Sequence, residues 1–283
     1  ALNLGLAETL QLVRPLCGLL YLGAIYWFIT LVETNRLHRW VAFAVIAFGG
    51  GLGWTLVVLK QFSGQLFFPL DVYVTEANTF LTILAFPHQA AASGLLILII
   101  CLATLAMERR SFNLAVWAGL LGLLLGFQHG YDLLIVYSVL GVFSVSLALQ
   151  ARWRLRSYVV AYYSRLLAVS MAMPTGQWLS FLGVFIVVGL CSAPAVVYLV
   201  YLTQVSPIWK GVLGQYGNAG VYTPDPLHLL VLMGLPLLLI LIIRVERPAG
   251  EDINVRQLAV GSWLLIGFFL LYIPTDFQVK MLA

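Results

Sequence analysis

The sequence predicts an all-α fold, a polytopic transmembrane bundle of about eight spanning helices with additional interfacial helices. The first reason is composition. Of the 283 residues, 62% are hydrophobic and only 9% are charged, whereas soluble domains carry roughly 25% charged residues. The second reason is that long apolar runs recur along the chain, with a mean hydropathy of +0.99. Such a chain cannot cover its surface in water, so we expect an integral, multi-pass membrane protein in contact with membrane lipids.

The predicted spans follow from the length that a bilayer requires. A spanning helix needs about 20 mostly apolar residues. We treat residues 1–283 as a single transmembrane domain. The spans are predicted near 12–32, 41–59, 89–107, 113–128, 132–149, 179–203, 227–243 and 257–273.

Two segments between the spans have a distinct character. Residues 157–173 carry one charge among tyrosines and leucines, which predicts an interfacial helix. Residues 204–226 are rich in glycine and proline, which predicts a long loop.

Glycines mark two of the predicted spans. Residues 49–54 read GGGLGW, but no strand precedes them, so we interpret them as a kink or a close helix contact and not as a phosphate loop. Gly122 and Gly126 form a GxxxG pattern that is typical of close helix packing.

The basic residues predict the orientation of the chain. Membrane proteins keep lysine and arginine on the cytoplasmic side. Alternate loops hold Arg36, Arg39, Arg109, Arg110, Arg152, Arg154, Arg156, Arg165, Arg244, Arg247 and Arg256. The opposite side holds only Lys60, Lys210 and Lys280, with Arg14 at its rim. The arginine-rich loops are therefore predicted to be cytoplasmic, and the loop from Lys60 to Ser93 is predicted to lie on the outer side.

The Lys60–Ser93 loop concentrates ionisable groups that are rare in this chain: Asp71, Glu76 and His88. The two carboxylates are candidates for a general base or for ligands of a divalent cation. His88 follows Pro87 at a predicted helix start, where free N–H groups favour phosphate or carboxylate. The alternative is that both carboxylates are simply solvated in an outer loop.

A second candidate group is the short outer turn Gln128-His129-Gly130-Tyr131-Asp132. Its brevity keeps His129 and Asp132 close to the membrane surface. The alternative is that Asp132 caps a helix and that His129 is an ordinary interfacial histidine.

The sequence contains few features that are typical of other classes of function. Cys17, Cys101 and Cys191 lie far apart in apolar runs, which predicts small core residues and not a disulfide or zinc site. Walker, HExxH and GxSxG motifs are absent from the sequence. The outer side lacks a cationic surface, which argues against nucleic acid as a partner.

Five segments lie in order along nearly the whole chain: 49–54 (GGGLGW), 76–88 (EANTFLTILAFPH), 129–133 (HGYDL), 194–209 (PAVVYLVYLTQVSPIW) and 272–280 (YIPTDFQVK). Together they resemble the polytopic GT-C type glycosyltransferase-like proteins, which use polyprenyl-phosphate-linked sugars. In that family we would expect proline at Gly130 and arginine at Lys280. The resemblance also implies a further N-terminal helix and a first acidic outer loop before the segments matched here, so this chain corresponds to a fragment of that pattern.

The resemblance implies a lipid-linked sugar at the outer face and an acceptor hydroxyl activated by a carboxylate. Asp71 and Glu76 are the catalytic candidates. Lys60, His88, His129 and Asp132 are the substrate-binding candidates, and a divalent cation is a possible cofactor. The alternative functions are a non-catalytic structural or assembly subunit that binds other membrane subunits and, third, a lipid or solute transporter.

Overall fold

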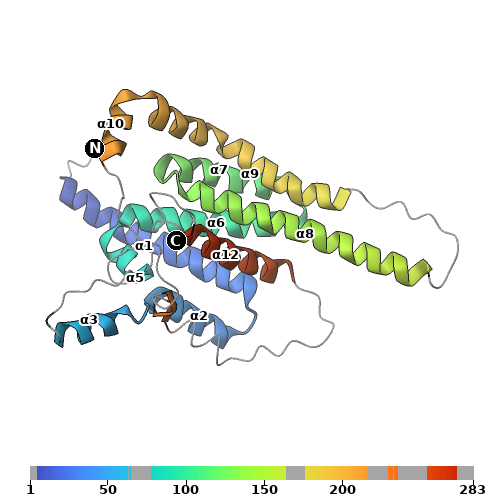
Figure 1. The fold of residues 1–283 in the computed structure, drawn as a ribbon, viewed down its shortest axis with the longest axis horizontal. Coiled ribbons are helices and arrows are strands. Elements are labelled where there is room, and N and C mark those ends of the chain that lie inside the picture. The colour runs from blue at the N-terminus through green and yellow to red at the C-terminus, as the bar shows by residue number, and fades with distance from the viewer. Residues whose placement is uncertain are drawn as a thin grey trace. The chain divides into compact units, whose positions relative to one another are not determined.

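Helices make up every regular element that the computed structural model describes (Figure 1). The structure describes residues 5–62, 64, 78–163, 176–215, 229–231, 233–234 and 254–272. The helices of the first half are α1 (Leu6–Val32), α2 (Arg36–Phe48), α3 (Gly53–Phe62), α5 (Thr79–Ala85), α6 (Pro87–Arg109) and α7 (Phe112–Gln128). They are followed by α8 (Asp132–Tyr163), α9 (Gly176–Val200), the π-helical η2 (Tyr201–Val205), α10 (Pro207–Gln215) and α12 (Val255–Leu271). The all-α prediction is confirmed for this part of the chain.

Four helical segments are long and apolar enough to cross a membrane: Ala7–Val32, Pro87–Arg109, Asp132–Gln150 and Ser180–Val205. α2 and α3 form a fifth candidate if they are counted as one span, bent by 42°. α7 and α12 are apolar helices of 17 residues each, shorter than a typical span. The predicted span at 227–243 lies mostly outside the described residues.

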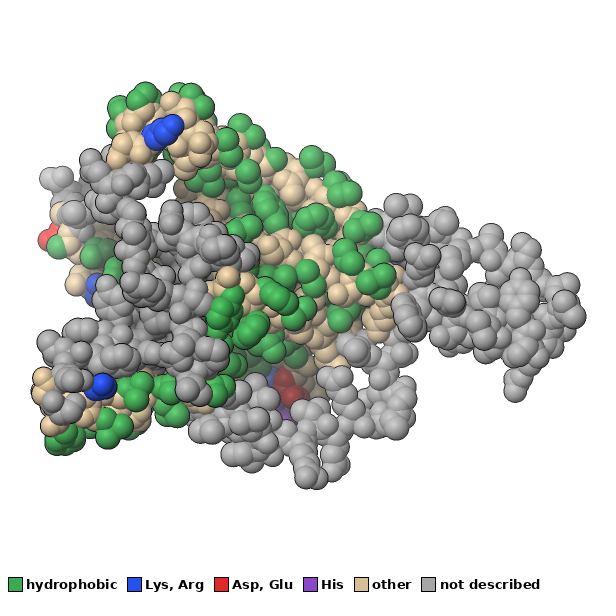
Figure 2. All heavy atoms as spheres, viewed as in Figure 1, with side chains coloured by type: hydrophobic (Ala, Val, Ile, Leu, Met, Phe, Trp, Pro, Cys, Tyr) green, Lys and Arg blue, Asp and Glu red, His purple; other side chains and the backbone are tan. Residues whose placement is uncertain are grey.

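The spans differ in how much of their surface the protein covers. In the most apolar part of Pro87–Arg109, 78% of the residues are buried, against 22% for Ala7–Val32 and for Ser180–Val205. Exposed hydrophobic side chains are spread over the described helices (Figure 2). The less covered helices therefore have the apolar surface that lipid contact requires.

The chain divides into two compact units. The first comprises Ala1–Leu98, Val200–Asp252 and Gly267–Ala283, and the second comprises Ile99–Leu199 and Ile253–Ile266. The division falls within α6, α9 and α12.

In the first unit, α1 packs against α2 and α5. The ring of Tyr26 lies 5.4 Å from that of Trp40 and 5.7 Å from that of Phe43, centroid to centroid. A Cβ atom added to Gly18 would lie 2.8 Å from the Ile83 side chain, so glycine allows α5 to approach α1 closely.

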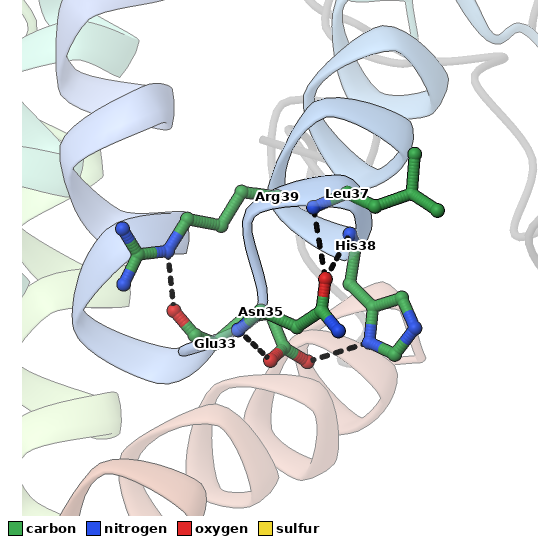
Figure 3. Close-up of polar contacts among 5 residues, drawn as sticks. All are labelled: Glu33, Asn35, Leu37, His38 and Arg39. Atoms are coloured by element: carbon green, nitrogen blue, oxygen red, sulfur yellow. Dashed lines mark hydrogen bonds and ion pairs between the residues drawn. The ribbon is translucent and has the colours of Figure 1, made fainter.

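A polar turn joins α1 to α2 (Figure 3). The side chain of Asn35 accepts from the backbone N–H groups of Leu37 and His38, and so caps the start of α2. The N–H of Asn35 donates to the Glu33 carboxylate over 2.7 Å, and Nε of Arg39 donates to the Glu33 carbonyl over 2.6 Å. The Asn35 N–H is the main cause of a lowered pKa for Glu33.

The glycine-rich segment 49–54 separates α2 from α3. The N–H of Leu52 donates to the Val231 carbonyl over 2.8 Å, which satisfies one backbone group that the break leaves unpaired. A Cβ on Gly234 would lie 2.9 Å from Cα of Gly51. The prediction of a kink or a close contact at this segment is confirmed.

In the second unit, the glycines of α7 pack on small residues of α9. A Cβ on Gly119 would lie 2.5 Å from Cβ of Cys191, and one on Gly126 would lie 2.5 Å from Cβ of Ala195. Because the glycines of α7 have no side chain, small residues of α9 can approach the α7 backbone closely. The packing interpretation of the GxxxG pattern is confirmed, and all three cysteines are free.

The span predicted near 132–149 agrees with the candidate span Asp132–Gln150. α8 itself continues to Tyr163, through the arginine-rich segment predicted as a loop and into the interfacial helix predicted at 157–173. Residues 164–173 of that predicted helix lie outside the described residues. Arginine ends an apolar span, but alanine, leucine and arginine are all good helix formers, so the helix itself continues. The predicted loop 204–226 also contains α10, which begins at Pro207 because proline suits the first position of a helix.

Candidate functional site

The candidate site is the turn between α7 and α8, where His129, Tyr131 and Asp132 lie together. α7 ends at Gln128, and the N–H of His129 still donates to the Leu125 carbonyl over 2.7 Å. The N–H of Asp132 then donates to the His129 carbonyl over 3.1 Å, and α8 begins. A turn this short gathers three polar side chains at the junction of two apolar helices.

The three side chains form a hydrogen-bonded chain. Nδ1 of His129 lies 2.8 Å from Oδ2 of Asp132, and the Tyr131 hydroxyl is hydrogen-bonded to Nε2 of His129. The rings of His129 and Tyr131 lie 4.1 Å apart, centroid to centroid. An ionised carboxylate can only accept, so Nδ1 of His129 is the donor toward an ionised Asp132.

Asp132 is the most buried member of this chain. Its side chain is 3% exposed, and that of His129 is 10% exposed. Oδ1 of Asp132 is buried and has no hydrogen-bond partner within the described part of the chain. A buried carboxylate oxygen is costly to leave unpaired. Asp132 is therefore a fixed carboxylate, with one buried oxygen that accepts no hydrogen bond from the described residues.

This arrangement contradicts the helix-cap alternative for Asp132. A capping carboxylate accepts from backbone N–H groups of the first helical turn. Here Oδ2 is directed to His129, and Oδ1 accepts from none of the described groups.

Gly130 allows the turn to pack closely. A Cβ at this position would overlap the side chain of Leu199. The missing side chain therefore lets Leu199 pack against the backbone of the turn.

The other predicted site residues fall elsewhere. Lys60 lies in the last turn of α3, and His88 is the exposed second residue of α6. The ring of Phe86 meets the His88 ring edge-on at 6.0 Å. Both belong to the first unit, and His129 and Asp132 belong to the second. Of the predicted site residues that the structure describes, His129 and Asp132 are the two that it places in contact.

Asp71 and Glu76, the two catalytic candidates, lie outside the described residues. Among the residues that are described, no group of three or more His, Cys, Asp or Glu side chains could hold a metal ion. The described donor set therefore does not by itself fit the divalent cation considered from the sequence.

Sequence reasoning missed Tyr131. A tyrosine at the edge of an apolar helix is usually assigned to the interfacial aromatic belt. The available signal was its position inside the three-residue turn between His129 and the first residue of α8.

Comparison with known proteins found no matching family model, no matching curated protein and no matching solved structure.

Proposed function

We propose that this chain is a multi-pass membrane glycosyltransferase of the GT-C-like type, or an inactive relative, that uses a lipid-phosphate-linked sugar at the outer membrane face. The observation that supports this most is Asp132, a buried carboxylate oriented by His129 and with one unpaired oxygen. A sugar or acceptor hydroxyl is the kind of donor that such an oxygen binds.

The proposed reaction is a transfer of the glycosyl group. A carboxylate accepts the proton of the acceptor hydroxyl as the hydroxyl oxygen bonds to the anomeric carbon. The bond between that carbon and the phosphate oxygen breaks, and the polyprenyl phosphate leaves with the electron pair. Asp71 and Glu76 remain the candidates for the base. Asp132 and His129 are proposed to hold a substrate hydroxyl, and Lys60 and His88 to contact the phosphate.

The proposal includes eight spans, with the arginine-rich loops in the cytoplasm. One contact agrees with this sidedness. Arg256, at the start of α12, makes a bidentate ion pair with Glu108, near the end of α6, with distances of 3.0–3.1 Å. The distribution of arginines assigns both of these helix ends to the cytoplasmic side.

The test is a transfer assay with the full-length protein in lipid nanodiscs. A panel of radiolabelled polyprenyl-phosphate sugars is supplied, and the release of polyprenyl phosphate is followed. We expect release with at least one donor, and its loss in Asp71→Asn or Glu76→Gln. Unchanged activity in both variants would remove the Lys60–Ser93 loop from the mechanism. Absence of transfer with every donor would favour the structural or assembly subunit.

A transporter is the second candidate, and the break between α2 and α3 favours it. Interrupted helices bind substrate in many transporters. In this chain Val231 and Gly234 pack against the break. Uptake of solute into proteoliposomes without cleavage of any lipid-linked sugar would support this alternative.

A further inference from the structure

We propose that α10, together with the preceding η2, is a membrane-interface anchor that lies in the lipid headgroup layer. This inference does not depend on the proposed function. It rests on the exposure of the two helices, on their chemistry and on their place directly after a candidate span.

The apolar side chains of this segment are exposed. The exposed fractions are 77% for Ile208 and 47% for Trp209 on α10, and 55% for Tyr201 and 63% for Val205 on η2. Removing apolar surface from water contributes about 25 cal/mol per Å². Contact with lipid would therefore stabilise this segment, whereas contact with water would not.

Chain continuity indicates where that lipid is. The candidate span Ser180–Val205 ends in η2, and α10 begins two residues after it. Ser206 between them has extended backbone angles (φ −72°, ψ 116°), so the helix does not continue straight on. α10 thus starts where a bilayer-crossing segment leaves the hydrocarbon core.

The length of α10 decides between spanning the bilayer and lying on it. Nine residues give a helix of about 14 Å, less than half of the roughly 30 Å hydrocarbon core. α10 is therefore too short to cross a membrane. A helix this short can instead lie in the interface, with apolar side chains about 5–10 Å into the headgroup and acyl boundary.

The residue types fit the same layer. Tyrosine and tryptophan are enriched at the membrane interface because one end of each side chain is polar. Lys210 is exposed, and two residues correspond to about 200° of helical rotation from Ile208. Its ammonium group can therefore reach lipid phosphates while Ile208 faces the acyl chains.

The test places a fluorophore at two sites of the full-length protein in nanodiscs. Cys17, Cys101 and Cys191 are replaced by alanine, and Ile208→Cys and Lys210→Cys are labelled separately with an environment-sensitive dye. A Thr34→Cys variant, at an exposed position of the α1–α2 turn, serves as control. Quenching is measured with aqueous iodide and with lipids that carry a nitroxide near the headgroup.

We expect a blue-shifted dye at position 208, quenched by the lipid nitroxide and shielded from iodide, and a more iodide-accessible dye at position 210. Strong iodide quenching at both positions, equal to that at position 34, would overturn the proposal. Shielding from both quenchers would also overturn it, since protein and not lipid would then cover α10.

Discussion

At the scale of single residues, the environment of Asp132 is what makes it a candidate site residue. A His–Asp pair three residues apart is common in sequences. This pair is distinguished by its environment. The Asp132 side chain is only 3% exposed, and the imidazole of His129 is directed toward it. Oδ1 of Asp132 has no hydrogen-bond partner among the described groups. Tyr131 extends the chain of hydrogen bonds by one group.

Removing the Tyr131 hydroxyl should weaken this turn without removing the ring contact. We expect Tyr131→Phe to lower the free energy of unfolding by about 0.5–1.5 kcal/mol, the typical net value of one hydrogen bond. The measurement is thermal unfolding in detergent. Tyr198→Phe is the matched control, because it keeps the ring contact of Tyr198 with Phe127. Equal shifts in both variants would contradict a specific role for the Tyr131 hydroxyl.

Glu33 gives a prediction about pH. Its pKa is lowered mainly by the N–H of Asn35, with a further contribution from His38. A carboxyl with a lowered folded pKa contributes stability above its unfolded pKa, about 4.3, and loses it as the pH falls through the folded pKa. We therefore expect the stability difference between the wild type and Glu33→Gln to be small but present near pH 6 and to vanish in more acidic solution. A difference that grows on acidification would refute this account of the turn.

At the scale of elements, close approach of α7 and α9 organises the second unit. Glycines on α7 face Cys191, Ser192 and Ala195 on α9. The Tyr137 hydroxyl also lies 2.7 Å from Oγ of Ser192 and so links α8 to α9. These contacts support the two helices that the candidate turn connects.

A methyl group at Gly126 should separate α7 from α9. Its Cβ would lie 2.5 Å from Cβ of Ala195 and 2.7 Å from the Leu133 side chain. We expect Gly126→Ala to destabilise the protein by about 1–3 kcal/mol. Gly183→Ala on α9 is the control, since a Cβ there meets nothing within 4 Å. Helix propensity should make that control neutral or stabilising. Similar losses in the two variants would argue against the packing account.

The sequence predicted the elements better than their ends. Charge-free runs located α1, α6 and α9, and the glycines at 49–53 located the break between α2 and α3. The continuation of α8 to Tyr163 was missed because hydropathy reports lipid contact and not helix formation. The contact among Tyr131, His129 and Asp132 was only partly predictable, since the burial of Asp132 depends on tertiary packing that a local sequence pattern does not contain.

At the scale of the whole molecule, the proposed orientation in the membrane can be tested at two exposed positions. Gln61 and Asn254 are both exposed, and the distribution of arginines assigns them to opposite sides of the membrane. In a cysteine-free background, we expect Gln61→Cys to react with an impermeant maleimide in intact cells. Asn254→Cys should react only after permeabilisation. Labelling of both in intact cells would contradict the proposed topology.

The central claim is that the α7–α8 turn binds substrate in a glycosyl transfer reaction. The most direct measurement compares the transfer rates of Asp132→Asn and Ser144→Ala in nanodiscs, with the donor that the wild type uses. Ser144 is a matched control because it lies on the same helix and is also buried, with an unpaired polar atom. We predict a loss of about ten- to a hundredfold for Asp132→Asn, because the substrate hydroxyl would lose a hydrogen bond to a charged group, and a wild-type rate for Ser144→Ala. A wild-type rate for Asp132→Asn would contradict the claim.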